Sequence, residues 1–88
     1  MLVAWQSSHL RGVARAATLG LGGLFLATPD PLPVGTLIKL LFDVPTGEVR
    51  ARAMVKNIKA GEGMAVAFID MHHSDRARLS QLLKTLVQ

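Results

Sequence analysis

TLIKLLFDVPTGEVRARAMVK, residues 36–56, is the stretch that decides the fold of this chain. In its first half the apolar residues Ile38, Leu40 and Phe42 alternate with Lys39 and Asp43, and Thr36 shares their face. In its second half an apolar series alternates with a polar one that carries three cations; the apolar series is Val49, Ala51, Ala53 and Val55. A period of two is typical of a strand with one buried face. The stretch therefore predicts two strands.

The residues between these strands have the chemistry of a tight turn. Pro45 fixes its own φ, and Gly47 accepts a positive φ that other residues avoid. Residues 36–56 are therefore predicted to form a β-hairpin. Shorter apolar segments predict four more strands, at residues 2–6, 12–18, 24–28 and 64–69. Pro29, Pro31 and Pro33 predict a loop before the hairpin, and residues 59–63 predict a second turn.

After residue 70 the apolar period changes from strand to helix. Leu79, Leu82, Leu83 and Leu86 follow the i, i+3, i+4, i+7 spacing of an amphipathic helix. Ser74 is predicted as the N-cap, with Asp75 in the first turn, so the helix is expected over about 75–87. Six strands with one covering helix close most economically as a barrel. We expect one domain over residues 1–88: a mainly β, six-stranded antiparallel barrel at about 2–70, with the C-terminal helix across one opening.

Composition restricts the class of protein and its partners. The chain has 88 residues, no cysteine and a formal net charge of +4. A disulfide framework and a thiolate metal site are therefore excluded, and anionic partners are favoured. The N-terminal residues do not resemble a signal peptide, and the longest apolar run, 19–27, is shorter than the roughly 20 residues of a membrane helix. We expect a cytoplasmic protein that does not insert into a membrane.

A glycine-rich segment, TLGLGGLFL at residues 18–26, precedes the loop. Such a turn can cradle a phosphate, seat a flat ligand or let two backbones approach closely. A dinucleotide-binding fingerprint needs glycine at 20, 22 and 25, but Phe25 occupies the last position and a strand follows in place of a helix. A Walker loop needs a lysine followed by serine or threonine, which this segment lacks. The spacing alone favours a bend.

Cations gather in two places along the predicted strands. Arg11 and Arg15 are four residues apart, so in a strand they share one face, where two guanidinium groups suit a phosphate or a guanine edge. Arg50, Arg52 and Lys56 form a second stripe, an expected anion or partner surface. In both places a solvated strand face is the simpler interpretation.

No catalytic constellation stands out, and the chain is not expected to be an enzyme. His72 and His73 are adjacent, so their rings are expected to diverge, and His9 stands alone; no metal site is predicted. Trp5 and the three phenylalanines lie in apolar company, so they are expected in the core and not on a nucleic-acid stacking surface.

Three stretches of the chain resemble the PilZ domain family. They are residues 18–26, then PVGT at 33–36, then GMAVAFID at 63–70 ahead of the helix. The last stretch, with its spacing to the helix, is the most specific. The resemblance implies a six-stranded barrel with a C-terminal helix, in agreement with the pattern above. It also implies a place in bacterial cyclic di-GMP signalling, with cyclic di-GMP as the possible ligand and no cofactor.

The resemblance further implies which residues would bind that ligand. The family uses an arginine pair, RxxxR, before the first strand and a [D/N]xSxxG motif on the barrel. Here the second motif falls on Thr18, Gly20 and Gly23, of which only the glycine matches. Arg11 and Arg15 match the spacing of the first motif, but only two residues separate Arg15 from Thr18. They are expected in the strand that enters the turn, and the family's own pair would precede Met1.

These substitutions predict weak recognition of the nucleotide. A bidentate arginine–guanine contact contributes about 1–3 kcal/mol, and a hydrogen bond to a charged group contributes about 1.5–3 kcal/mol. Misplacement of the arginines together with loss of the acidic and hydroxyl groups therefore removes about 4–8 kcal/mol of binding free energy, or about 10³-fold or more in affinity. We therefore expect a regulatory module that acts mainly through a protein partner, with weak or no nucleotide binding. The alternatives are a receptor that uses Arg11 and Arg15 in an atypical arrangement and, less favoured, a small nucleic-acid-binding barrel.

Overall fold

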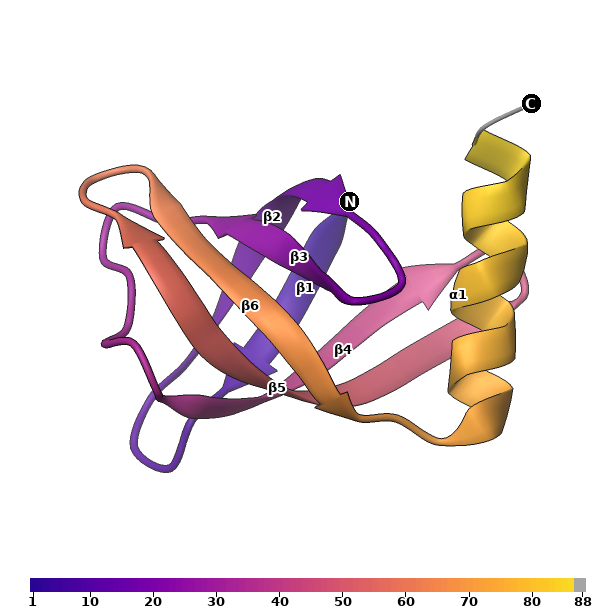
Figure 1. Cartoon of the computed structure of the whole chain (residues 1–88), viewed down its shortest axis with the longest axis horizontal. Coiled ribbons are helices and arrows are strands. Elements are labelled where there is room, and N and C mark those ends of the chain that lie inside the picture. Colours follow the sequence, from indigo (N-terminus) through magenta and orange to yellow (C-terminus); the bar gives the residue numbers. More distant parts are fainter. Residues whose placement is uncertain (87–88) are drawn as a thin grey trace.

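The computed structural model of the chain describes residues 1–86. Within them it contains, in chain order, β1 (Leu2–Gln6), β2 (Arg11–Leu19), β3 (Gly23–Ala27), β4 (Leu37–Val44), β5 (Gly47–Lys59), β6 (Gly63–Asp70) and α1 (His73–Leu86). The strands surround one interior, and α1 stands at one end of the molecule beside β4 and β5 (Figure 1). The predicted mainly β fold with a C-terminal helix is confirmed.

Every strand pairs antiparallel with its neighbours, and the sheet closes on itself. The order around the barrel is β1-β2-β3-β6-β5-β4, with β4 paired again to β1. Four of the six ladders join strands that follow each other in the chain. The other two, β1 with β4 and β3 with β6, join distant segments and close the barrel.

The predicted hairpin is β4–β5, and its two faces are as expected. Val44 pairs with Gly47 across the two-residue connection, and Gly47 has a φ of +139°. The inward residues of both strands are at most 8% exposed, and Ile38, Phe42 and Val55 among them at most 3%. They meet Leu26 of β3 and Met64 of β6, which are fully buried. The hairpin therefore forms one wall of the single core.

The helix begins two residues earlier than predicted, and Ser74 is not its N-cap. The carbonyl of His72 accepts the N–H of Arg76 at 3.0 Å, which makes His72 the last residue before the helix. The Ser74 N–H donates to Nδ1 of His72 at 3.2 Å, so the imidazole takes the capping role. Histidine is not among the preferred N-cap residues, which is why the sequence pointed to serine. Position 87 of the predicted helix lies outside the described residues.

The apolar stripe of α1 packs onto the open end of the barrel. Leu79 is fully buried in the core, and Leu82 and Leu83 pack against it. Leu86 was predicted on the same stripe but is 65% exposed. The contact with β5 and β4 therefore ends about one turn before the end of α1.

Two glycines allow β3 and β6 to approach each other. Gly23 lies opposite Ala67 at one end of this ladder, and Gly63 lies opposite Ala27 at the other. A Cβ on Gly23 would collide with the backbone carbonyl oxygen of Val66, and a Cβ on Gly63 would collide with that of Leu26. A backbone carbonyl oxygen cannot move aside as the end of a flexible side chain can. Within the bend predicted for residues 18–26, glycine is therefore required at position 23 so that β3 and β6 can approach each other closely.

We expect Gly23→Ala to lower the free energy of unfolding by about 1–3 kcal/mol, because β3 and β6 must separate to admit the methyl group. Gly22→Ala is the matched control, since a Cβ there meets nothing within 4 Å, and should change stability by less than about 0.5 kcal/mol. Urea unfolding followed by Trp5 fluorescence measures both. Equal stability of the two variants would contradict this role of Gly23.

Candidate functional site

The glycine-rich turn between β2 and β3 is held by backbone hydrogen bonds. The Gly20 N–H donates to the Gly23 carbonyl at 2.9 Å, and the Phe68 N–H of β6 donates to the Gly22 carbonyl at 2.9 Å. The β2–β3 register shifts between Ala16 and Thr18, which leaves Thr18 exposed. The turn is thus tied to β6 from behind, and its Gly20 N–H is already used within the turn.

A shallow hollow of about 400 Å³ lies beside this turn, on the outer face of β3 and β6. We call it the turn hollow. Thr18, Gly23 and Phe25 line one side of it, and Lys56 is its one charged lining residue within the described part of the chain. Most of the remaining lining is alanine, valine and glycine. The hollow offers a ligand one hydroxyl and one ammonium group.

Phe25 is not a core residue, contrary to the sequence prediction. It lies between the buried Leu24 and Leu26, so its side chain points outward, where its ring lies close over Gly63. Phe42 is 2% exposed and does belong to the core. Alternation along β3 indicates this outward position, because Phe25 lies between two inward leucines. Apolar character alone does not distinguish the two faces of the strand.

Arg11 and Arg15 both lie in β2 and are both exposed on its outer face. Arg11 is opposite Gln6 of β1; Arg15 is opposite Leu2 of β1 and Ala27 of β3. Four residues of strand separate their Cα atoms by about 13 Å. Neither arginine lines the turn hollow. The structure therefore places the pair on one face, as predicted, without bringing it to Thr18, Gly20 and Gly23.

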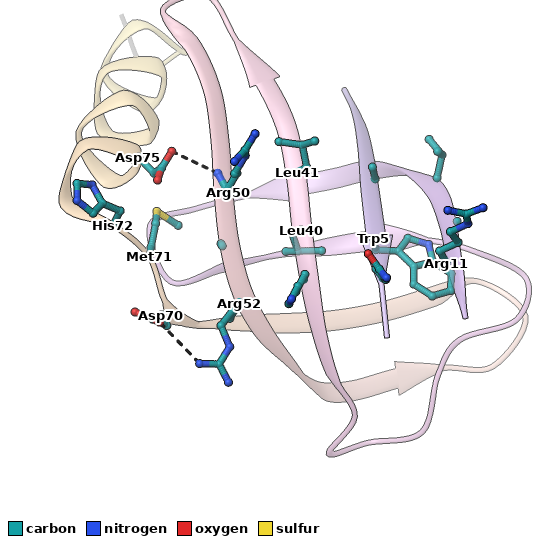
Figure 2. A pocket seen from close by; sticks show the side chains of 16 residues that line it. Trp5, Arg11, Leu40, Leu41, Arg50, Arg52, Asp70, Met71, His72 and Asp75 are labelled. Carbon is teal, nitrogen blue, oxygen red and sulfur yellow. Dashed lines mark hydrogen bonds and ion pairs between the residues drawn. The ribbon is translucent and has the colours of Figure 1, made fainter. Parts of the chain in front are cut away.

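A larger depression of about 770 Å³ lies on the other side of β2, over the outer face of β1, β4 and β5 (Figure 2). We call it the outer groove. Arg11 lies on one side of it and Arg52 on the other, with Leu41 between them and Met71 at the side where α1 begins. The sequence did not predict this groove, because its residues come from strands that are distant in the chain.

The cationic stripe of β5 is divided between these two depressions. Arg50 and Arg52 line the outer groove, whereas Lys56 lines the turn hollow. Arg50 contacts Glu48 at 3.7 Å and Arg52 contacts Asp70 at 3.8 Å, in both cases between exposed side chains. Exposed ion pairs of this kind contribute at most about 1 kcal/mol. Both guanidinium groups thus remain available to a stronger anionic partner.

His72 and His73 pack together instead of diverging as expected. Their ring centroids are 4.2 Å apart with an angle of 33° between the planes. The His72 ring is engaged with Ser74, with 2.7 Å between Nδ1 and Oγ. Within residues 1–86, no three histidine, cysteine, aspartate or glutamate side chains gather where they could share a metal ion.

Comparison with known proteins places this barrel in a family. The sequence model of the PilZ domain matches residues 7–85, from the end of β1 to within the last turn of α1. The chain belongs to the PilZ domain family. PilZ domains are in general regulatory domains associated with cyclic di-GMP, which they bind as a ligand and not as a cofactor.

A solved structure agrees with the fold of this PilZ domain. The chain is similar to the crystal structure of the PilZ domain of CeSA from a cellulose-synthesizing bacterium, with a TM-score of 0.71 and 16% sequence identity. The similarity covers 99% of this chain and 92% of that one. No curated protein matches the sequence. Within residues 1–86, no helix has the length and apolar character needed to cross a membrane.

Asp75 fixes the end of the outer groove, because its carboxylate joins α1 to β5. It accepts the Arg50 N–H at 3.4 Å and contacts Arg78 at 3.6 Å, within the first turn of the helix. We expect Asp75→Ala to lower the free energy of unfolding by about 1 kcal/mol, since it removes both contacts and a favourable charge at the helix N-terminus.

Glu48→Ala is the matched control, because within residues 1–86 the one ion pair of its exposed carboxylate is with Arg50. Its effect should stay within about 0.5 kcal/mol. Thermal and urea unfolding of both variants give the comparison. An Asp75→Ala protein as stable as the parent would show that this junction does not hold α1.

Proposed function

We propose that this PilZ domain is a cytoplasmic, non-enzymatic regulatory module of cyclic di-GMP signalling that acts mainly through protein contacts. In this proposal it binds the nucleotide weakly or not at all. The exposed apolar side chains on its strands, among them Leu2, Val13 and Leu37 at 49–65% exposure, favour contact with another protein.

The observation that carries the proposal is the identity of the one motif residue that this chain retains. Of the family's [D/N]xSxxG motif only the glycine is present, at Gly23. That glycine is required by packing alone, because a Cβ there would strike the carbonyl oxygen of Val66. Its presence is therefore explained by closure of the barrel and needs no ligand.

The two substituted motif positions are under no such packing constraint. Thr18 is exposed, and a Cβ on Gly20 would have only the Gly23 carbonyl oxygen nearby, at 3.9 Å. The barrel would accept the family's carboxylate and hydroxyl groups at these positions, yet this chain lacks both. Each hydrogen bond to a charged group contributes about 1.5–3 kcal/mol, so two lost contacts weaken binding by about 10²–10⁴-fold.

Isothermal titration calorimetry with cyclic di-GMP at low salt tests the proposal. We expect no saturable binding in the micromolar range, because the turn hollow offers only Thr18 and Lys56 as polar partners. Sub-micromolar affinity with a defined stoichiometry would overturn the proposal.

Restoring the motif gives a second test. We expect Thr18→Asp combined with Gly20→Ser to strengthen cyclic di-GMP binding by at least about tenfold, since one or two charge-assisted hydrogen bonds return. Thr18→Asp combined with Gly22→Ser is the control, because position 22 is equally open but outside the motif. The control isolates the contribution of the serine hydroxyl at position 20. Binding by the Thr18→Asp, Gly20→Ser variant that is no tighter than that of the parent would show that loss of the motif groups is not the cause of weak binding.

The second candidate is a receptor that recognises the nucleotide with Arg11 and Arg15. The observation in its favour is that both guanidinium groups extend from the same exposed face of β2. If this candidate is correct, Arg15→Ala abolishes binding while Arg52→Ala does not. Equal losses in both variants, seen only at low salt, would indicate non-specific attraction of charge.

A further inference from the structure

The floor of the outer groove has two parallel rows of side chains that run across the strands. One row is apolar and follows the register from β2 through β1 to β4: Val13, Ala4 and Leu41. The other row lies two residues away from the first, on the same side of it in every strand, and continues onto β5. It is polar, with a cation at three of its four positions: Arg11, Gln6, Lys39 and Arg52. We call them the apolar row and the cationic row.

Sheet geometry fixes the spacing of these rows. Adjacent strands are about 4.8 Å apart, so Lys39 lies about 10 Å and Arg52 about 14 Å from Arg11 along the cationic row. Two residues of strand separate the rows by about 7 Å. Met71, His72 and Asp75 close the groove where α1 begins (Figure 2). The groove thus presents a ridge of charge beside a strip of apolar surface, with one closed end.

The charge of the groove indicates an anionic occupant. Within residues 1–86, Arg11 and Lys39 take part in no ion pair, and Arg52 has only its exposed contact with Asp70. A second copy of this chain is a poor occupant, because each copy carries a net charge of +4.

The closed sheet restricts the shape of that occupant. Since the barrel has no free edge, an extended segment cannot add to it as a further strand. An occupant must lie on the side chains of the two rows. In an α-helix, residues i, i+7 and i+11 share one face and lie about 10 and 16 Å apart along the axis, close to the spacing of the three cations. Apolar residues on the adjoining face then reach the apolar row.

We propose that the outer groove is the docking site for an acidic amphipathic helix of a partner protein. Its carboxylates would pair with Arg11, Lys39 and Arg52, and its apolar stripe would cover Val13 and Leu41. This inference rests on the proposed function and specifies the surface through which the protein contacts occur.

Nucleic acid is a weaker match for the same groove. Asp70 and Asp75 line it beside the cations. A phosphate backbone carries a charge at every nucleotide and meets their repulsion, whereas a helix can place uncharged residues opposite these two carboxylates. Trp5 is not an open stacking platform, because its ring lies over Gly12, where an added Cβ would meet it at 2.9 Å. Single-stranded binding surfaces rely on such platforms.

A designed helical peptide is the probe. It has about 14 residues, glutamates at i, i+7 and i+11, leucines at i+1, i+5, i+8 and i+12, and a lactam bridge on its far side, because helices this short are marginal in water. Trp5 lines the groove and is the only tryptophan of the chain, so its fluorescence reports binding of a tryptophan-free peptide. A peptide of the same composition in scrambled order is the control probe.

Two matched pairs of variants locate the contact. Lys39→Glu should weaken binding at least about fivefold, because it replaces an attraction with a repulsion, while Lys59→Glu, with the same charge change outside the groove, should have less than a twofold effect. Val13→Asp should weaken binding similarly, while Val34→Asp should not. Both valines are at least 60% exposed, so neither variant is expected to unfold the barrel.

Several results would overturn the inference. They are failure of the peptide to bind at about 1 mM, equal binding of the scrambled peptide, or equal losses within each variant pair. Lys39-dependent binding of a single-stranded oligonucleotide or of phosphatidylserine vesicles, with no binding of the peptide, would also overturn the inference. It would identify nucleic acid or an anionic membrane as the occupant of the groove. Tight binding of cyclic di-GMP would instead contradict the proposed function, whatever the peptide does.

Discussion

The close approach of β3 and β6 is the constraint on which the rest of this structure depends. Gly23 and Gly63 stand at the two ends of that ladder, and each faces a backbone carbonyl oxygen of the opposite strand where a side chain would begin. Because β3 and β6 are far apart in the chain, this ladder and the β1–β4 ladder turn two sets of local hairpins into a barrel. The closed barrel then places the turn hollow and the outer groove on different parts of its surface.

This closure separates what the fold requires of the glycine-rich turn from what a ligand would require of it. Gly23 serves packing, whereas Thr18 and Gly20 lie in open surroundings. In this chain the groups at positions 18 and 20 can therefore differ from the family motif without disturbing the barrel. The barrel remains a frame for its other surfaces, including the outer groove that we propose as a docking site.

Much of the fold could be predicted from local pattern, and most of the site could not. Alternation over residues 36–56 and the Pro45–Gly47 turn predicted the β4–β5 hairpin, because both signals lie within a few residues. Parity also placed Arg11 and Arg15 correctly on one face of β2. The outer groove depends on the order β2-β1-β4-β5, in which β1 and β4 are joined only by a ladder between distant segments. The start of α1 was misplaced because His72 caps it through its imidazole, a role that composition does not indicate.

We propose above that the turn at residues 18–23 serves the fold and binds a dinucleotide weakly or not at all. Amide chemical shifts of ¹⁵N-labelled protein, followed during titration with cyclic di-GMP, test it most directly. The account predicts that the amides of Thr18, Gly20 and Gly23 show no saturable shift up to about millimolar nucleotide. Saturable shifts centred on these residues and Arg15 at micromolar nucleotide would contradict it.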